Sequence, residues 1–485
     1  MRTLPQFDLA KHDWKMIRTL RELVAPDDVG PTLPHEHVLQ RIAAVSAAPA
    51  AAAVDTAIRP EDLLDYRQNP WAHGGRNMAL QNEDEAFREL ERLQLLAAGA
   101  AMGSARKPLV VDVTLPVEGR DALARERLHL AERLTGLHLV TVTTFEIARL
   151  DEARFEGLTP HDQSDRVAKI LETELMFGIG SDGESSAATE ANAPTAYPGA
   201  MYQQINSVDA QLGNKERIIA KGLALVGNAQ ARTHAPLYLS FSREEASNGG
   251  VGSAAELQQL IHNWLRALVD AGAEGKKLII CHADRWCQGS LDCANYAFLL
   301  TLFKLGVTVL FDTIGLSTVS DAMLVNSAIK ITTGSQQHVL GDEESQEPPP
   351  DSRLAKWVAS FAIQHKYLHQ ILLSTNVHQR IQYRRYGGGG YTYVFEYFQP
   401  RLQRLGITVA QWDQLVRGNA VELLAWYVPP EAPPIPKNYL QCTICGNFFE
   451  PIEGEYFTKF AFIYCSTKCL RRHSRQKFAT PPATA

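Results

Sequence analysis

The chain has 485 residues, of which 45% are hydrophobic and 21% are charged, with a formal net charge of −6. These values are ordinary for a globular protein, and the negative charge gives no general attraction to nucleic acid or to an anionic membrane. No apolar run approaches the length of a membrane-spanning helix, and the N-terminus lacks the apolar core of a signal peptide. Four of the seven cysteines form a metal-like array, which favours a reducing compartment, so we expect an intracellular, cytoplasmic protein.

Helical segments alternate along the chain with short apolar runs of the buried parallel-strand type. An N-terminal extension, residues 1–24, is expected to contain a helix around residues 14–23, and a strand then leads into His35. Further helices are expected at residues 82–98, 121–134, 160–177, 215–228, 254–271, 293–305 and 353–366. Further strands are expected at residues 109–114, 137–143, 200–205, 236–240, 277–282, 307–312 and 370–374.

This alternation predicts an α/β protein, a (β/α)8 TIM barrel that spans residues 25–427. A doubly wound sheet is the structural alternative. Such a sheet would ordinarily carry a glycine-rich phosphate turn after its first strand, and the sequence has none there.

Two histidines stand one residue apart in Gly30-Pro-Thr-Leu-Pro-His35-Glu-His37. Residues i and i+2 of a strand project from the same face, so His35 and His37 can bind one cation. At the carboxyl end of a barrel strand they would point into the mouth, where barrel enzymes keep their chemistry. The spacing alone is equally compatible with an accidental pair.

This stretch and four others together resemble the phosphotriesterase family of amidohydrolases, in its phosphotriesterase-related branch. The others are Val111-Asp-Val-Thr with Gly119-Arg-Asp, His282-Ala-Asp-Arg285, Phe311-Asp312-Thr-Ile-Gly315, and Asn376-Val-His378 through Tyr386-Gly-Gly-Gly-Gly-Tyr391. The resemblance implies a barrel mouth that binds two divalent cations. It also implies the ligands: a first-strand histidine pair, a bridging lysine carbamate or glutamate on strand four, histidines on strands five and six, and an aspartate on strand eight.

Only part of that implied ligand set is present. The histidines of strands one and six are His35, His37 and His282. The altered positions are Gln203 or Gln204 on strand four, Ser240 on strand five and Asn376 on strand eight.

Two neighbouring cations need an anionic bridge to offset their repulsion, and the altered positions are neutral. We therefore expect no dinuclear centre. The barrel either binds a single Zn²⁺ on His35 and His37, with His282 as an optional third ligand, or keeps the three histidines as hydrogen-bonding groups only. Asp284, Arg285 and Asp312 remain as polar candidates at the mouth, where a salt-bridge network is the simpler interpretation for Arg285.

A second module follows a proline-rich linker at residues 428–437. Four thiols, Cys442, Cys445, Cys465 and Cys469, have the spacing of a structural four-cysteine zinc site. Residues 464–473 resemble a treble-clef finger whose last ligand lies on the opening turn of a helix, with His473 as an alternative to Cys469. We expect this zinc finger at residues 438–478, a tail at 479–485, and a small finger core formed by Phe448, Phe449, Phe457 and Phe460.

Three functions compete. The first is an amidohydrolase-fold pseudoenzyme, non-catalytic or weakly catalytic, that serves as a binding or scaffold protein. The second is an active zinc-dependent hydrolase of ester, lactone, amide or phosphoester bonds, and the third is a nucleic-acid-binding finger carried by an inert barrel.

The neutral ligand positions favour the first function, and the net charge with the lack of a base-reading motif counts against the third. We expect a protein partner at the basic helix of the finger and a small-molecule ligand in the barrel mouth. No membrane association is expected.

Overall fold

The computed structural model describes residues 15–41, 58–68, 74–99, 106–147, 150, 155–181, 195–206, 215–242, 254–287, 289–316, 349–428, 439–444, 448–449, 451, 456–475 and 478. Contacts divide the chain into two compact units. One comprises residues 17–426, and the other comprises residues 1–16 and 427–485. No helix among the described residues is both long enough and apolar enough to cross a bilayer.

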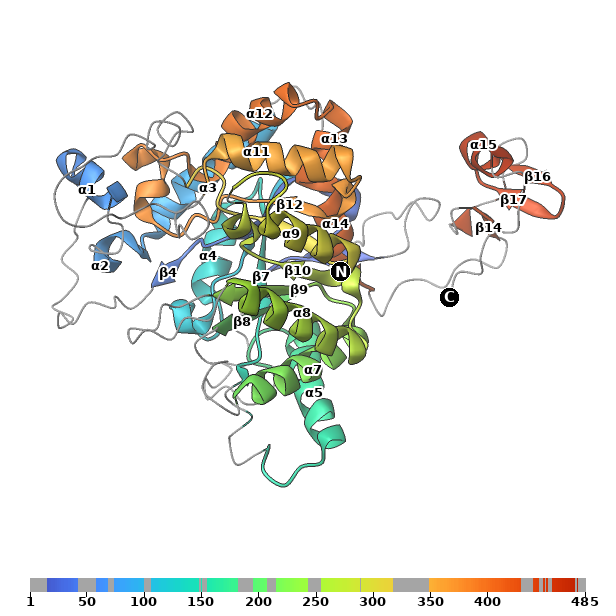
Figure 1. The fold of residues 1–485 in the computed structure, drawn as a ribbon, viewed down its shortest axis with the longest axis horizontal. Coiled ribbons are helices and arrows are strands. Elements are labelled where there is room, and N and C mark those ends of the chain that lie inside the picture. The colour runs from blue at the N-terminus through green and yellow to red at the C-terminus, as the bar shows by residue number, and fades with distance from the viewer. Residues whose placement is uncertain are drawn as a thin grey trace. The chain divides into compact units, whose positions relative to one another are not determined.

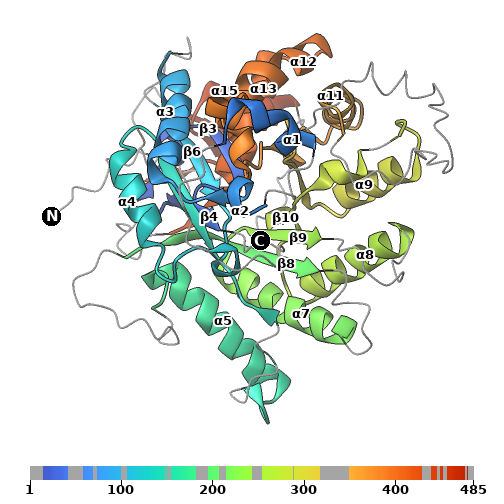
Figure 2. The same cartoon turned by 90° about the vertical axis from the view of Figure 1, so that its left-hand side faces the viewer.

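The larger unit is built on an eight-stranded parallel sheet surrounded by helices, which confirms the predicted barrel (Figures 1 and 2). Its strands, in the order of the sheet, are β3 Val29–Glu36, β6 Lys107–Asp112, β7 His138–Thr143, β8 Pro198–Asn206, β9 Leu237–Ser242, β10 Leu278–Ile280, β11 Thr308–Phe311 and β12 Ile371–Leu373. The main helices between them are α3 Glu83–Gly99, α4 Arg125–Arg133, α5 Pro160–Phe177, α7 Lys215–Thr233, α8 Ala254–Asp270, α9 Ala294–Lys304 and α11 Asp351–Ala359.

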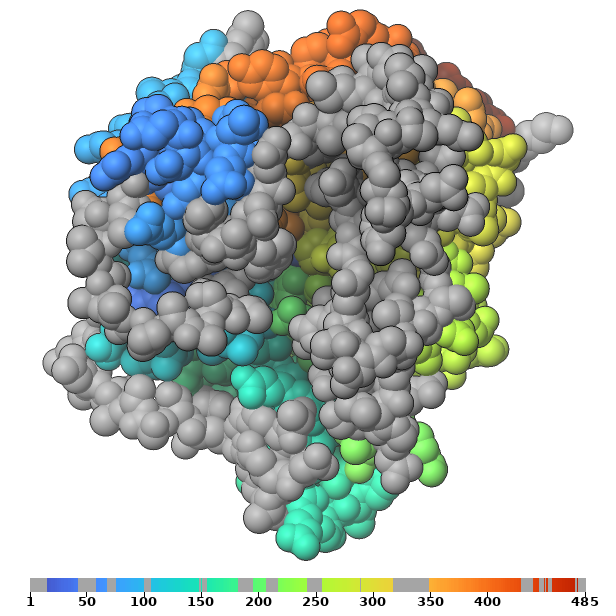
Figure 3. Space-filling model, turned by 60° about the vertical axis from the view of Figure 1, so that its left-hand side comes forward, coloured from blue at the N-terminus to red at the C-terminus, as the bar shows by residue number. Residues whose placement is uncertain are grey.

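Shorter elements complete this unit. They are α1 Leu63–Gln68, α2 Gly74–Asn77, α12 Gln399–Arg404, α13 Val409–Asp413, α14 Asn419–Leu424 and the antiparallel pair β4 Gln40–Arg41 and β5 Ala79–Leu80. On the face drawn in Figure 3, the residues around α1 and α2 (blue) stand on one side and those around α9 (yellow) on the other.

The prediction of a helix around residues 14–23 is wrong. Residues Met16–Arg18 form β1, which lies between β2 (Leu23–Val24) and β13 (Ala425–Tyr427) in a small sheet. Ile17 is fully buried. Pairing with a strand at the far end of the barrel sequence overrides the local preference of this short segment.

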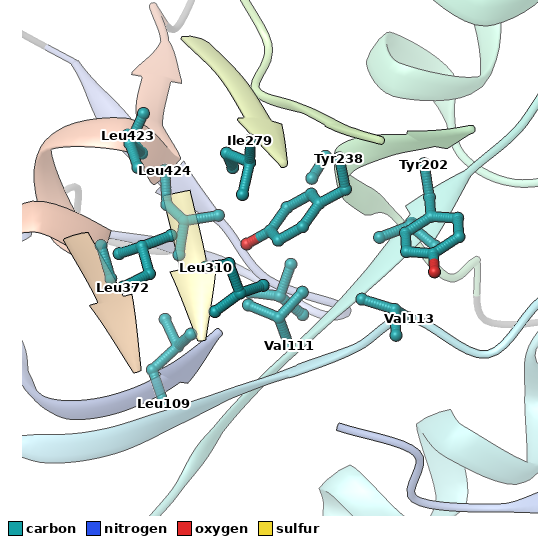
Figure 4. Close-up of a cluster of buried hydrophobic side chains, with 14 of the residues drawn as sticks. Leu109, Val111, Val113, Tyr202, Tyr238, Ile279, Leu310, Leu372, Leu423 and Leu424 are labelled. Atoms are coloured by element: carbon teal, nitrogen blue, oxygen red, sulfur yellow. The ribbon is translucent and has the colours of Figure 1, made fainter. Parts of the chain in front are cut away.

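The interior of the barrel is filled by alternate residues of the strands (Figure 4). On β6 and the residues after it, Leu109, Val111 and Val113 point inward, and Tyr202 of β8 stacks on Tyr238 of β9 with ring centroids 6.3 Å apart. Because the other face of each strand is buried beneath helices, these strands are near-continuous apolar runs. Burying each large side chain contributes roughly 1.5–3 kcal/mol.

Glu36 joins the two ends of the sheet, β3 and β12. Its fully buried carboxylate accepts hydrogen bonds from Ser374 Oγ at 2.7 Å, from Thr375 Oγ1 at 2.6 Å, and from the backbone N–H groups of Thr375 at 2.9 Å and Val377 at 2.6 Å. The N–H of His37 also donates to Val377 O, at 3.2 Å. The segment after β12 is thereby attached to β3, which carries the histidine pair.

The finger contains two short antiparallel pairs, β14 Leu440–Gln441 with β15 Phe448–Phe449 and β16 Phe457–Lys459 with β17 Phe462–Tyr464, followed by α15 Thr467–Arg475. The buried centre of its described part is His473, which packs between Phe462 and Phe478. Phe449 is buried as expected, but Phe460 is 66% exposed because it lies at the tip of the β16–β17 hairpin.

Candidate metal centre in the barrel mouth

The ends of β3, β10 and β11 bring two predicted histidines and a predicted aspartate together. His35 lies on β3, His282 follows β10 by two residues, and Asp312 directly follows β11. Carboxyl ends of parallel strands meet at one end of a barrel, so these side chains converge there. Ligand atoms of the three residues lie within 4.8 Å of one another, and His35 and Asp312 are fully buried.

Asp312 holds both imidazoles through their Nδ1 atoms. Its Oδ1 lies 2.9 Å from His282 Nδ1, and its Oδ2 lies 3.0 Å from His35 Nδ1 and accepts the His282 backbone N–H at 3.1 Å. Burial alone would raise the pKa of Asp312, but the neighbouring His282 and His35 rings hold it well below its usual range. An ionised carboxylate accepts hydrogen bonds from Nδ1–H groups, so Nε2 carries the lone pair, as in metal-binding histidines.

His37 is oriented by a different chain of hydrogen bonds. Its Nδ1 lies 3.0 Å from Thr114 Oγ1, and the Thr114 hydroxyl donates to Asp112 Oδ1 at 2.6 Å. Arg127 Nε donates to the other oxygen of Asp112. Because Thr114 gives its only proton to Asp112, it must accept one from His37 Nδ1, so Nε2 is again the lone-pair nitrogen.

The protonation state and the hydrogen bonding of these rings are compatible with a bound cation. Burial lowers the pKa of His37, and it lowers that of His282 to about 4, so both are neutral at neutral pH, which is the form that binds metal. Nδ1 of His35 faces Asp312, but within the described part of the chain His35 Nε2 and Asn376 Oδ1 are buried without a hydrogen-bond partner. Buried polar atoms without partners are rare and require an explanation, and a bound divalent cation supplies one.

Asn376 lies in a strained loop after β12. Its backbone φ is +46°, in the left-handed region that Asn tolerates better than most residues. Its carbonyl oxygen accepts from His378 Nδ1 at 2.6 Å, and the His378 ring lies 6.4 Å from that of His37. The structure therefore places the backbone of Asn376 against His378, whose ring neighbours that of His37, and Asn376 has a neutral side chain where the family resemblance implies a carboxylate.

Tyr202, which sequence analysis missed, is the β8 side chain that contacts His35. The two rings meet edge to face, with centroids 5.9 Å apart. Tyr202 faces the barrel interior, so its neighbour Gln203 faces the surrounding helices, and Gln204 returns to the interior opposite Ser240. Ser240 is hydrogen-bonded to the Tyr202 hydroxyl.

Asp284 and Arg285 lie in a single turn after β10 but differ in environment. Buried Asp284 accepts the backbone N–H groups of Asp312, at 3.0 Å, and of Thr313, so it braces the loop that carries Asp312. Burial and the nearby Asp312 charge raise the pKa of Asp284 to about 7. Arg285 is exposed and donates to Phe241 O at 3.3 Å, and no carboxylate of the described residues forms an ion pair with it.

Glu118 is a further carboxylate that sequence analysis did not consider. It ends the turn Pro116–Glu118 after β6, where its Oε2 accepts the Leu115 N–H at 2.9 Å and lies 3.9 Å from His37 Nδ1. Its side chain is 20% exposed. Its position directly before Gly119-Arg-Asp, a motif already noted, is the signal that could have found it.

The finger carries a second, separate cluster. The sulfurs of Cys442, Cys465 and Cys469 lie within 4.8 Å of one another, and Cys465 Sγ is 3.8 Å from Cys469 Sγ. Two thiolates bound to one tetrahedral zinc at about 2.3 Å are about 3.8 Å apart, so this spacing fits zinc. Cys445 lies outside the described residues. His473 is not in the cluster, because its Nδ1 lies 2.9 Å from the Tyr464 hydroxyl within the finger core.

Comparison with known families identifies both modules. The model of the phosphotriesterase family matches residues 15–424. The chain belongs to the phosphotriesterase family. The model of the Vms1-associating treble clef domain matches residues 437–481, which confirms the treble-clef prediction.

The curated relatives include N-acetyltaurine hydrolases from several vertebrates. That of Rattus norvegicus is 24% identical over 414 residues, which cover 84% of this chain and 98% of the relative. That of Tetraodon nigroviridis is 23% identical over the same coverage.

Solved structures show the same fold. A resiniferatoxin-binding protein from Rhodobacter sphaeroides has a TM-score of 0.58 and 22% identity, covering 84% of this chain and 95% of that one. An amidohydrolase from Mycoplasma synoviae has a TM-score of 0.52 and 16% identity, covering 86% and 93%. At these identities the likeness concerns the fold alone.

Proposed function

We propose that the barrel is a metal-dependent hydrolase that uses one divalent cation, held by Nε2 of His35 and His282, with His37, which lies outside the group whose ligand atoms are within 4.8 Å of one another, as the third ligand. One observation carries the proposal: each of these rings presents its Nδ1 to Asp312 or Thr114, which leaves Nε2 as its ligand atom. The sequence alone favoured a pseudoenzyme because ligand positions are neutral. The intact supports behind all three imidazoles favour the hydrolase instead.

A bound cation would supply Lewis acidity toward a water molecule and a scissile carbonyl group. The chain's own residues orient the histidine ligands. Asp312 and Thr114 fix the tautomers of the histidines. Asn376 is neutral and cannot accept a proton from water, and Glu118 lies 3.9 Å from Nδ1 of His37, on the side of the ring away from Nε2.

The proposed substrate class rests on a positively charged side chain near the histidines. Arg285 is exposed next to His282, and its guanidinium can bind a carboxylate or sulfonate through two hydrogen bonds. The relatives are named for N-acetyltaurine, which combines an amide with a sulfonate. We therefore propose an N-acyl amine with an anionic group as the substrate of this chain.

The experiment is hydrolysis of N-acetyltaurine by the purified full-length protein loaded with Zn²⁺, Co²⁺ or Mn²⁺, followed by the release of taurine. His35→Ala should lower the rate at least about 100-fold, since it removes a ligand. His161→Ala, on an exposed position of α5, should leave it unchanged. A metal-loaded wild type that does not exceed the buffer rate on N-acyl amines, lactones and phosphotriesters would contradict the hydrolase and support the binding or scaffold protein.

A second function concerns the finger, which we propose to be a partner-binding module folded around a zinc ion on Cys442, Cys445, Cys465 and Cys469. Residues 457–478 contain six Lys and Arg residues and no Asp or Glu. Such a surface favours an acidic protein partner. The family description, a Vms1-associating treble clef, is consistent with a role in protein association.

A further inference from the structure

The interior of the barrel next to His35 is occupied by a pair of hydroxyl groups. Tyr202 of β8 is 5% exposed, and its ring lies edge to face with that of His35. On its other side it stacks on Tyr238 of β9 (Figure 4). Its hydroxyl is hydrogen-bonded to Ser240, which is 3% exposed. The pair is therefore a packed part of the barrel wall.

Tyr202 and Ser240 lie on β8 and β9, the fourth and fifth barrel strands, which carry ligands in the two-cation set that the family resemblance implies. Two cations a few ångströms apart repel each other and require an anionic bridge. Asp312, the carboxylate of this cluster, is already committed to the Nδ1 atoms of His35 and His282. The interior positions near the ends of β8 and β9 are neutral, because Gln204 lies opposite Ser240 and the Tyr202 hydroxyl is hydrogen-bonded to Ser240.

We infer that Tyr202 and Ser240 take the place of a second metal ion, so that the barrel mouth binds one divalent cation and excludes another. The inference rests on the proposed function for the first cation. The large ring of Tyr202 fills the space beside His35, and the hydrogen bond to Ser240 keeps it there. The site is consequently complete with one cation rather than a two-cation site that has lost an ion.

The experiment counts metal ions. Full-length protein is stripped with a chelator, titrated with Co²⁺ and analysed for bound metal. The ion in the finger is identified by its thiolate charge-transfer absorption and subtracted. The wild-type barrel should bind one ion, and Tyr202→Glu combined with Ser240→His, which supplies a carboxylate and an imidazole, should bind two.

The matched control is Tyr202→Phe with Ser240→Ala. It removes the hydrogen bond without adding a ligand and should remain at one barrel ion. A folded Glu/His variant that gains no ion, or a wild-type barrel that binds two, would overturn the inference. A wild-type barrel without any ion contradicts the proposed function instead, and the gain in the Glu/His variant then still decides the inference.

A measurement on the wild type alone covers the case in which the Glu/His variant fails to fold. Electron paramagnetic resonance of the Co²⁺-loaded protein should show a magnetically isolated barrel ion, with an intensity that, after subtraction of the finger ion, rises linearly up to one barrel equivalent. Exchange coupling between two barrel ions would overturn the inference.

Discussion

Asp312 is the residue on which the arrangement of the histidines depends, since each of its oxygens faces one imidazole Nδ1. In Asp312→Asn only one oxygen remains, and the amide N–H₂ would oppose an imidazole N–H. We expect metal affinity of the barrel to fall about 10- to 100-fold, as for other carboxylates that orient histidine ligands. Competition with a fluorescent chelator measures this. Asp270→Asn, at the exposed end of α8, is the control, and equal affinities for both variants would contradict the role of Asp312.

Arg285 should act on substrate binding and not on the chemical step. In Arg285→Gln, KM for N-acetyltaurine should rise about 10- to 100-fold, the value of a charge-assisted hydrogen bond, while kcat stays within a few-fold. The neutral analogue N-acetylethylamine should show no change in KM. Arg266→Gln, exposed on α8, is the matched control. A fall in kcat with unchanged KM would show that Arg285 does not bind the anionic group.

At the scale of elements, the barrel depends on the attachment of β3 to the segment after β12. Glu36→Gln replaces a carboxylate that accepts four hydrogen bonds with an amide, whose NH₂ group would face donors that now point at a carboxylate oxygen. We expect a loss of about 2–4 kcal/mol in the free energy of unfolding of the barrel. Urea unfolding followed by Trp fluorescence measures it against Glu126→Gln, an exposed change on α4. A difference below about 0.5 kcal/mol would show that this attachment is dispensable.

His138 on strand β7 makes the stability of the barrel sensitive to acid, because its side chain is only 7% exposed. Burial and the charge of Lys107 lower its pKa to about 4. In the unfolded chain His titrates near 6.5, so between these values the unfolded state binds more protons and stability falls as pH falls. The contribution is at most about 3 kcal/mol, fully present above pH ~6.5 and lost toward pH ~4.

The test is the slope of stability against pH over that window. His138→Gln should have a shallower slope than wild type, whereas His161→Gln, at an exposed position, should keep the wild-type slope. Because burial also lowers the pKa of His282 and of His378, only the difference between variants is informative. Identical slopes would show that folding does not lower the pKa of His138.

The sequence predicts the elements well where local pattern decides them, and less well where tertiary contacts do. Apolar runs between amphipathic helices predict the barrel strands, and H-x-H predicts a shared face. The strand-four position shows the limit: a shift of one residue exchanges the inward and outward faces, so Gln203 and Tyr202 are hard to distinguish without the register. The link from Asp312 to two rings joins β3, β10 and β11, and no local spacing encodes it.

At the scale of the whole molecule, the chain forms two units of very different size, and the smaller depends on metal. A finger this short buries little apolar surface, so thiolate–zinc bonds should supply much of its folding free energy. Cys442→Ser should therefore unfold the finger and leave the barrel transition unchanged, and binding to an acidic partner should weaken. Calorimetry of wild type and variant, with protease sensitivity after residue 428, measures this. A barrel that melts with the finger would show that the two units are cooperative.

The two clusters differ in the softness of their donor atoms. The finger presents polarisable sulfur, whereas the barrel presents imidazole nitrogen close to oxygen-bearing side chains. Soft ions such as Cd²⁺ and Cu⁺ favour the first set, and harder ions such as Mn²⁺ are accepted only by the second. One chain can therefore carry two different metals at once, and the composition of the surrounding metal pool can change one module without changing the other.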